Sequence, residues 1–338
     1  MIIDQLVRLI LLPPVFTIIV FPGLIAVLVV IVFLIWLERK IAAKVQLRYG
    51  PLYILKPLGG VIQTVADLLR YLFAEVIIPR RADKFSFIMA PILSFGFAFI
   101  PIAALPISSR YFAFRSDLSL LIVLALLTIA PIFILIIGWA SDNKFSFIGS
   151  LREGYMIMAY EVPLFLSVLA MAILYNTLDI IEIVEAQSKG VWGIILNPFA
   201  AFTFLICTFM MTARFPFEIS EAEQEIVMGP FTEYSGIIFG LCMSYSYIKL
   251  YILSLLFAYL FLGGWYPIVW PLTLNPIMPG IITLIKGLII MILGIFLRSV
   301  YPRFRIDQTL RIGWEGMFTL SIASLILSFA LINLGLVR

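Results

Sequence analysis

Long apolar runs separated by short polar stretches dominate the 338-residue chain. A helix needs about 20 consecutive apolar residues to cross the hydrocarbon core of a membrane. Eight runs meet this requirement and predict an all-α integral membrane protein with eight transmembrane helices. The predicted spans are 14–37, 86–107, 118–140, 154–175, 195–213, 234–262, 277–298 and 315–336.

The segment 55–75 has a different pattern. Its apolar residues recur every three or four positions, and Gln63, Asp67 and Arg70 interrupt them at helical spacing. This pattern predicts an amphipathic helix that lies at the membrane surface on the cytoplasmic side. An ordinary cytoplasmic helix packed on a partner protein would show the same pattern.

The distribution of Lys and Arg predicts the orientation of the chain. With eight spans, both termini lie on one side of the membrane. Sixteen of the 23 basic residues lie on the other side, in or at the edge of the loops 38–85, 141–153, 214–233 and 299–314. Basic loops stay in the cytoplasm, so we expect a multi-pass plasma-membrane protein with both termini outside. We find no inverted repeat and no low-complexity linker, and we interpret residues 1–338 as one membrane domain.

Composition supports a lipid environment and limits the chemistry. Hydrophobic residues make up 63% of the chain and charged residues 12%, against about 25% charged in a soluble domain. In a membrane chain, the net charge of +4 is better explained by topology than by nucleic-acid binding. Histidine is absent, and Cys207 and Cys242 both lie in apolar runs, so no metal site and no disulfide framework is predicted. Proton chemistry must therefore use carboxylates, Lys, Tyr or water.

The densest group of acidic residues lies between the fifth and sixth predicted spans. It consists of Glu218, Glu221, Glu223, Glu225 and Glu233. Ser220 and Glu223 fit a capping box, and Gly229-Pro230 is a stop signal, so a short helix over 221–228 is predicted. At helical spacing, Glu218, Glu221 and Glu225 would share one face. Like charges that close raise one another's pKa toward neutrality, which suits proton uptake and release. A solvated acidic loop is the alternative.

Glu161 lies inside the fourth predicted span, two residues before Pro163. A charged carboxylate in a span costs roughly 2.5–3.5 kcal/mol on insertion scales, so Glu161 should face a polar cavity or be protonated. We expect Pro163 to kink the helix and help to hydrate the site. Lys249 and Lys286, in the sixth and seventh spans, are candidate partners, and a purely structural pairing is the alternative.

Ordered motifs along nearly the whole chain resemble one family. They include Glu38-Arg39-Lys40, Gln46-Leu47-Arg48-Tyr49-Gly50-Pro51, Gly138-Trp139-Ala140-Ser141, Tyr160-Glu161-Val162-Pro163, Pro216-Phe217-Glu218, Glu221-Ala222-Glu223 and Tyr301-Pro302-Arg303-Phe304-Arg305. This set is similar to that of the quinone-site membrane subunit of respiratory complex I, the prokaryotic NADH-quinone oxidoreductase.

The resemblance implies a non-redox subunit of a quinone oxidoreductase that translocates protons. Quinone would be the substrate, and iron–sulfur clusters would belong to partner subunits. The implied partners are peripheral iron–sulfur and quinone-site subunits, small membrane subunits and antiporter-like subunits. The resemblance places the quinone cavity at Arg39, Arg48, Asp67, Phe217, Glu221 and Glu223. It places a proton-coupling path at Glu161, Glu218, Glu221, Glu223 and Glu225, balanced by the cations Arg214 and Arg298.

The chain departs from the family pattern at two places. Met211-Thr212-Ala213-Arg214 stands where Glu-Thr-Asn-Arg is common, and Ser246-Tyr247 stands where a Glu-Tyr pair is usual. Both departures remove a carboxylate near the expected path. An alternative is therefore the equivalent subunit of an energy-converting hydrogenase or a ferredoxin-linked complex that uses no quinone. A free-standing transporter or channel is a further alternative, which the missing repeat and the amphipathic segment 55–75 disfavour. A membrane anchor without chemistry would leave Glu161 and the acidic loop unexplained.

Overall fold

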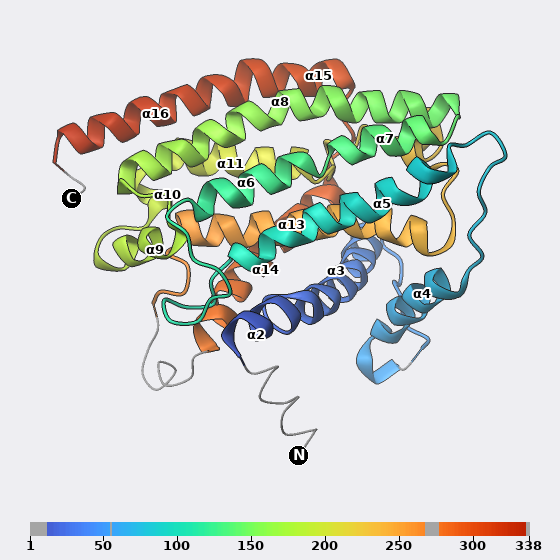
Figure 1. Cartoon of the computed structure of the whole chain (residues 1–338), viewed down its shortest axis with the longest axis horizontal. Helices are drawn as coiled ribbons and strands as arrows, with labels where there is room; N and C mark the ends of the chain where they lie inside the picture. Colours follow the sequence, from blue (N-terminus) through green and yellow to red (C-terminus); the bar gives the residue numbers. More distant parts are fainter. Residues whose placement is uncertain (1–11, 55, 268–276, 336–338) are drawn as a thin grey trace.

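The computed structural model describes residues 12–54, 56–267 and 277–335, and this part of the chain is helical without a β-strand (Figure 1). The predicted placement of the termini concerns residues 1–11 and 336–338, which lie outside the described residues. The elements are α2 (Pro13–Ile19), α3 (Leu24–Val45), η1 (Lys56–Leu58), α4 (Val61–Phe73), α5 (Lys84–Phe99), η2 (Ile100–Ala104), α6 (Ser119–Ile129), α7 (Ile132–Ala140), α8 (Lys144–Tyr175), α9 (Ile180–Lys189), α10 (Gly193–Leu196), α11 (Pro198–Met211), α12 (Glu223–Ile226), η3 (Gly229–Phe231), α13 (Gly236–Phe261), α14 (Met278–Val300), α15 (Ile306–Arg311), η5 (Ile312–Met317) and α16 (Phe318–Asn333).

Seven helical stretches in the described residues are long and apolar enough to cross a membrane. They are Pro13–Val45, Lys84–Ala104, Ser119–Ala140, Lys144–Tyr175, Gly236–Phe261, Met278–Val300 and Ile306–Asn333. The fifth predicted span, 195–213, is represented by α11, which has 14 residues. At 1.5 Å per residue, α11 is about 21 Å long, shorter than a hydrocarbon core of about 30 Å. It packs among α8, α13 and α16, where neighbouring helices cover its apolar surface.

Local signals explain where several helices begin or break. The side chain of Asn143 accepts a hydrogen bond from the amide of Phe145 at 2.9 Å, so α8 begins ten residues before the predicted span 154–175. Asn197 caps α11 in the same way, through the amide of Ala200 at 3.0 Å. The predicted span 118–140 is divided into α6 and α7 at Pro131, which has no amide to donate. In contrast, α8 continues through Pro163 as one helix of 32 residues.

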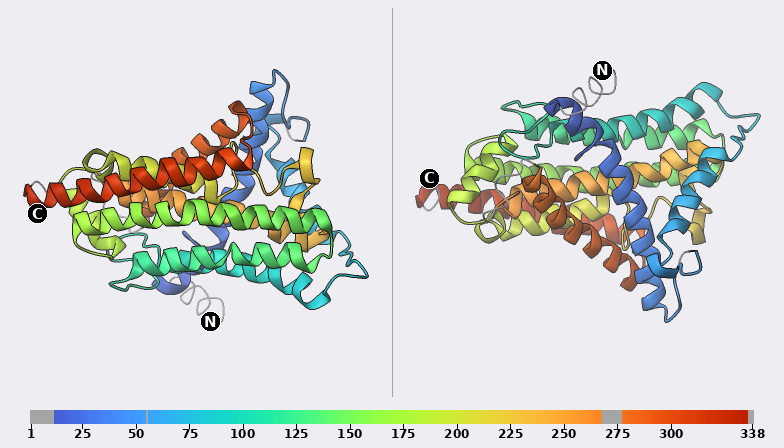
Figure 2. Two further views of the ribbon diagram at one scale, coloured as in Figure 1. Left: turned by 90° about the horizontal axis from the view of Figure 1, so that it is seen from above. Right: turned by 90° about the horizontal axis from the view of Figure 1, so that it is seen from below.

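The long helices form a bundle around α13, the most buried of the seven stretches. Figure 1 shows α8 and α16 side by side along one edge of the bundle, and Figure 2 shows α3 tilted across the other helices with α4 beside its end. The indole of Trp36 on α3 donates to the carbonyl of Gly59 at 2.9 Å, which holds the segment before α4 against α3. The helix α4 therefore stands at the end of the bundle and not within it.

The four connections predicted to share one side of the membrane are joined to one another by hydrogen bonds. The Asp83 amide donates to the Ala140 carbonyl at 3.1 Å. The Asn143 side chain donates to Glu233 at 2.5 Å. The Phe304 amide donates to the Pro216 carbonyl at 2.9 Å. One end of the bundle thus collects the loops that contain most of the basic residues and the acidic cluster.

Candidate functional site

The acidic loop, residues 212–235, connects α11 to α13 and folds differently from the prediction. Helix α12 has four residues, Glu223–Ile226, instead of the predicted 221–228. Its N-cap is Ala222, without a side-chain hydrogen bond, so Ser220 does not form the predicted capping box. The loop instead folds back on itself. Gly229 has a φ of +54°, and a Cβ at this position would lie 1.9 Å from the Ser220 carbonyl oxygen. This close approach requires glycine and ends the helix early.

The carboxylates of the acidic loop do not share one helical face, so the predicted grouping of Glu218, Glu221 and Glu225 is wrong. Glu218 is buried and Glu221 is partly buried, whereas Glu223 and Glu225 are exposed. Glu225 forms an ion pair with Arg152 on α8. Because Glu218 and Glu221 precede α12, the path of the loop decides where they lie.

A line of alternating charges begins in the acidic loop, passes through Glu38 on α3 and returns to the loop. The Glu38 carboxylate lies 3.2 Å from the Arg214 guanidinium, pairs with Arg298 and accepts a hydrogen bond from the Tyr247 hydroxyl at 2.8 Å. Arg298 also lies 3.4 Å from Glu218. We call the series Arg214, Glu38, Arg298, Glu218 and Arg303 the charge chain.

The charge chain brings together three segments that are distant in sequence. Glu38 comes from α3, Arg298 from α14, and Arg303 from the connection to α15, where its guanidinium lies 3.6 Å from Glu218. The Arg214 guanidinium also lies over the ring of Tyr247 on α13, 4.0 Å from its centroid. A change of charge at one member is therefore felt directly by its neighbours.

Two carboxyl groups of the acidic loop have a raised pKa. Burial raises the pKa of Glu218, although Arg298, Arg303 and Arg214 oppose the shift. Burial also raises the pKa of Glu221 to about 7, and the charge of Glu218 adds to this shift. Burial disfavours the charge of Arg214, but Tyr247 and Glu38 outweigh it and the pKa of Arg214 is raised. Glu221 can therefore gain and lose a proton near neutral pH while Arg214 stays charged.

Inside the bundle, the structure separates Glu161 from its two predicted cations. Glu161 is partly buried on α8 and has no hydrogen bond or ion pair with the described residues. The Lys249 ammonium donates to the Met211 carbonyl at 2.6 Å. The Lys286 ammonium donates to the carbonyls of Leu262, Gly264 and Tyr266. The expected pairing of Glu161 with either lysine is wrong, because main-chain carbonyls at helix ends bind both ammonium groups.

The residues expected at the quinone cavity lie in two places. Arg39 on α3 pairs with Asp67 on α4 at 2.5 Å, and the nearby Arg48 is exposed and donates to Gln46 at 2.7 Å. Phe217 lies in the acidic loop with Glu221 and Glu223. It is buried, and its ring centroid is 5.7 Å from that of Phe304.

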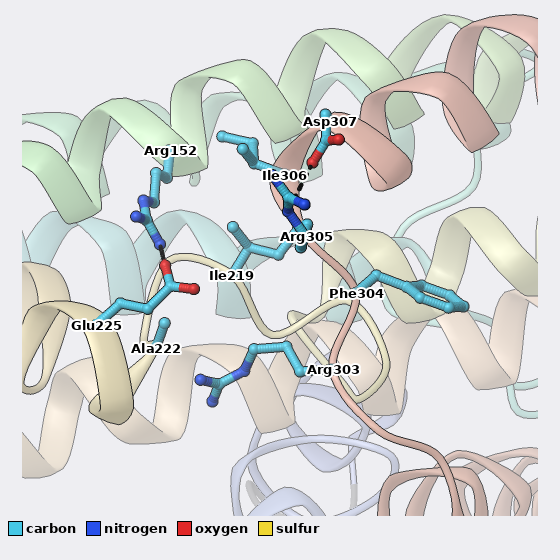
Figure 3. Close-up of a pocket in the computed structure, with 9 residues that line it drawn as sticks. All are labelled: Arg152, Ile219, Ala222, Glu225, Arg303, Phe304, Arg305, Ile306 and Asp307. Atoms are coloured by element: carbon cyan, nitrogen blue, oxygen red, sulfur yellow. Dashed lines mark hydrogen bonds and ion pairs between the residues drawn. The ribbon is translucent and has the colours of Figure 1, made fainter.

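A cavity of about 240 Å³ opens beside the acidic loop, and none of these six residues lines it. Arg152, Glu225 and the connection from Arg303 to Asp307 form most of its wall (Figure 3). In the described residues, no group of three or more Cys, Asp or Glu side chains is placed to hold a metal ion.

Comparison with known proteins decides the family. The model of the NADH dehydrogenase family matches residues 17–329. The chain belongs to this family. It is also 37% identical over 306 residues to the NADH-quinone oxidoreductase subunit designated H from Geobacillus sp. (strain WCH70), and the match covers 89% of each chain. The resemblance to a membrane subunit of complex I that the motifs indicated is thereby confirmed.

Within this NADH dehydrogenase family member, two acidic residues near the acidic loop were not singled out as site residues from the sequence. Glu38 belongs to a quoted motif but was not assigned to the path, and Glu153 on α8 is 5% exposed. The available signal for Glu38 was its position directly after the first apolar run. The available signal for Glu153 was its position about two helical turns before Glu161. Neither signal reveals which groups surround the carboxylate. The packing of helices that are distant in sequence decides which groups these are.

Proposed function

We propose that this chain is the membrane subunit of a complex I-like quinone oxidoreductase and couples quinone reduction to proton translocation. The observation that supports this most is that two residues of the acidic loop, Arg214 and Glu218, are members of the charge chain. Glu218 belongs to the charge chain, and Glu221, whose pKa is about 7, lies within its electrostatic influence. Protonation of the loop can therefore change the charge balance that Glu38, Arg214 and Arg298 experience.

In the proposed mechanism the subunit carries no electrons. Quinone is reduced where this chain meets the peripheral arm, next to Arg39, Arg48, Asp67 and the acidic loop. Proton uptake by the reduced quinone leaves a charge imbalance against the loop carboxylates. This imbalance shifts the protonation of Glu218 to Glu225 and of Glu161, and so biases the neighbouring antiporter-like subunits.

We propose a membrane arrangement with eight crossings in one domain. The seven long stretches supply seven crossings, and α10 and α11 together supply the fifth in chain order. The loops that gather around the acidic cluster face the cytoplasm, because they contain most of the basic residues. Both termini lie outside the plasma membrane.

We place α4 at the cytoplasmic membrane surface. Thr64 is its buried residue, whereas Val65, Leu69 and Leu72 are each more than a third exposed. An isolated soluble surface would not expose such an apolar face, but the boundary of a bilayer or a neighbouring subunit would cover it.

Purification tests the assignment at the level of the complex. The native complex is extracted in mild detergent, its subunits are identified by mass spectrometry, and quinone reduction is assayed with and without a quinone-site inhibitor. We expect iron–sulfur and antiporter-like subunits as partners, with inhibitor-sensitive quinone reduction. A nickel-containing subunit and hydrogen evolution would move the chain to the hydrogenase-linked alternative, and purification as a lone chain would refute both.

Carboxylate variants test the coupling role. Glu161→Gln and Glu221→Gln remove an ionisable group with little change of shape, and Glu315→Gln serves as a control because its pair with Arg311 is exposed. Complexes with equal subunit content are placed in liposomes, and the protons translocated per quinone reduced are measured. We expect the first two variants to lose most of this ratio and the control to keep it. Full coupling in both Glu161→Gln and Glu221→Gln would refute the proposal.

A further inference from the structure

A cleft of about 360 Å³ opens where three of the membrane-length stretches end, away from the charge chain. Residues 79–81, residues 141–144 and Glu233 line it. The first segment leads into α5, and the second connects α7 to α8. The hydrogen bond from the Asp83 amide to the Ala140 carbonyl holds the start of α5 against the end of α7. The cleft therefore lies at the boundary between the polar end of the bundle and its apolar sides.

Three cations without partners line this cleft. Arg80, Arg81 and Lys144 are exposed, and their side chains form no hydrogen bond or ion pair with the described residues. Two carboxylates, those of Asp142 and Glu233, also line the cleft, and neither forms an ion pair with the three cations. Positive groups thus exceed negative groups by one, which leaves the cleft suited to a ligand with negative charge.

The cavity beside the acidic loop differs from the cleft in this respect. Its three arginines already have carboxylate partners: Arg152 pairs with Glu225, the Arg305 guanidinium lies 3.5 Å from Asp307, and Arg303 belongs to the charge chain (Figure 3). A ligand there would have to compete with carboxylates that are in place. The cations of the cleft are free to bind one.

The start of α8 adds to the positive character of the cleft. Residues 141–144 lead directly into this helix of 32 residues, and Lys144 is its first residue. The N-terminus of a helix carries a partial positive charge and presents main-chain amides, which together favour bound anions. The helix end and the three cations therefore attract the same kind of ligand.

Apolar side chains continue from the cleft along the outside of the bundle. Phe85, Ile88 and Ile92 are exposed on α5 at spacings of three and four residues, so they share one helical face. Ile132 and Trp139 are exposed on α7, which lies beside α5 (Figure 1). The exposed fractions of Phe85 and Trp139 reach 74% and 61% next to the cleft, and tryptophan is typical of the membrane–water interface. A small water-soluble anion would leave this apolar surface unused.

We propose that the cleft binds the phosphate of an anionic phospholipid, whose acyl chains lie along α5 and α7. The inference rests on the proposed membrane arrangement, which puts these loops at the cytoplasmic surface, and adds a lipid site to it. A guanidinium can donate two parallel hydrogen bonds to one phosphate, and the lysine ammonium supplies a point charge. A lipid with net negative charge balances the excess cation, whereas the amine of a zwitterionic lipid would add another positive group.

Photolabelling of the assembled complex tests this site. The complex is placed in phosphatidylcholine liposomes with a small share of phosphatidylglycerol that carries a photoactivatable acyl chain, and labelled peptides are identified by mass spectrometry. We expect labelling of α5 and α7 in the wild type. Arg80→Gln combined with Lys144→Gln should reduce this labelling about tenfold, because each basic side chain near a membrane surface contributes to the binding of anionic lipid.

A matched variant controls for the loss of positive charge on this side of the protein. Lys44→Gln combined with Lys56→Gln removes two exposed, unpaired cations that lie outside the cleft, and labelling of α5 and α7 should not change. Equal labelling of the two double variants would overturn the proposal. Arg80→Lys combined with Lys144→Arg keeps both charges and should keep the labelling. A loss as large as that of the glutamine variant would show that labelling does not follow charge, and would also overturn it.

Competition separates a lipid from a free anion and from a protein partner. Excess unlabelled phosphatidylglycerol should abolish the labelling, whereas the same amount of added phosphatidylcholine, or inorganic phosphate, should not. Equally strong competition by inorganic phosphate would show a site for a free anion and refute lipid binding. A wild-type complex without label on α5 or α7 would show that another subunit covers the cleft, and the lipid site would be wrong.

The lipid site and the proposed function can fail separately. Protons translocated per quinone reduced are measured in the same liposomes. If coupling is normal while α5 and α7 stay unlabelled, the function stands and the lipid site falls. If labelling follows the expected pattern but the wild-type complex translocates no protons, the lipid site stands and the proposed function falls.

Discussion

The guanidinium of Arg214 lies 3.2 Å from the carboxylate of Glu38, a residue 176 positions earlier in the chain. Arg298, 260 positions from Glu38, pairs with the same carboxylate. One acidic residue thus holds two cations, one from the acidic loop and one from α14, and connects α3 to both.

Glu38→Gln should destabilise the assembled complex substantially. The side chains of Glu38 and Arg214 are 13% and 3% exposed, so the substitution leaves a buried cation without its partner. Breaking such a pair typically costs about 3–5 kcal/mol. We expect a clearly lower melting temperature in a thermal-shift measurement of the purified complex. The exposed pair of Arg311 and Glu315 provides the control, since Glu315→Gln should cost less than about 1 kcal/mol. Equal melting temperatures for the two variants would contradict this view of Glu38.

Glu221→Gln should change how stability depends on pH. The pKa of Glu221 is raised from 4.5 to about 7 by burial and by Glu218, so the folded protein holds this proton more tightly than the unfolded chain does. The associated stability is fully present below pH 4.5 and is lost as pH rises to about 7. Glutamine cannot ionise and avoids this loss. Between pH 5 and pH 8, the melting temperature of the variant should therefore rise relative to that of the wild type. A constant difference between the two melting temperatures over this range would refute the prediction.

Glu225→Gln should have a small effect on stability. Its pair with Arg152 is partly exposed, at 54% and 21% for the two side chains, and exposed pairs contribute about 1 kcal/mol or less. Thermal-shift measurements of Glu225→Gln, Arg152→Gln and the double variant form a cycle that isolates the pair. A coupling free energy well above about 1 kcal/mol would show that the pair holds the acidic loop in place.

Gly149→Ala should separate α8 from the acidic loop. A Cβ at Gly149 would lie 2.7 Å from the Gly229 Cα atom and 2.8 Å from the Pro230 Cδ atom, so the two segments must move apart. Overpacking of this kind typically costs about 1–3 kcal/mol. The matched control is Gly96→Ala, also inside a helix, where an added Cβ meets no atom within 4 Å. A lower melting temperature for Gly149→Ala alone is expected, and equal values would show that the contact is not tight.

Much of the secondary structure followed from local patterns. Helices occupy all eight predicted apolar runs, although α11 is too short to count among the long stretches and α8 extends ten residues further toward the N-terminus. The error at α8 has a local cause, because Lys144 to Glu153 reads as a polar loop by composition while Asn143 starts a helix there. The predicted helix over 221–228 failed for a non-local reason, the close approach of Gly229 to Ser220.

The sequence by itself determined that this is an all-helical membrane protein with one charged end, and its motifs identified the family. Those properties depend on residue types counted along a run, which lipid and water sort without reference to distant partners. The tertiary structure decided the rest: that Glu38 joins Arg214 to Arg298, that Glu161 pairs with neither lysine, and that Lys249 binds the Met211 carbonyl 38 positions away. Buried charges require partners, and which partners are within reach is set by how the helices pack.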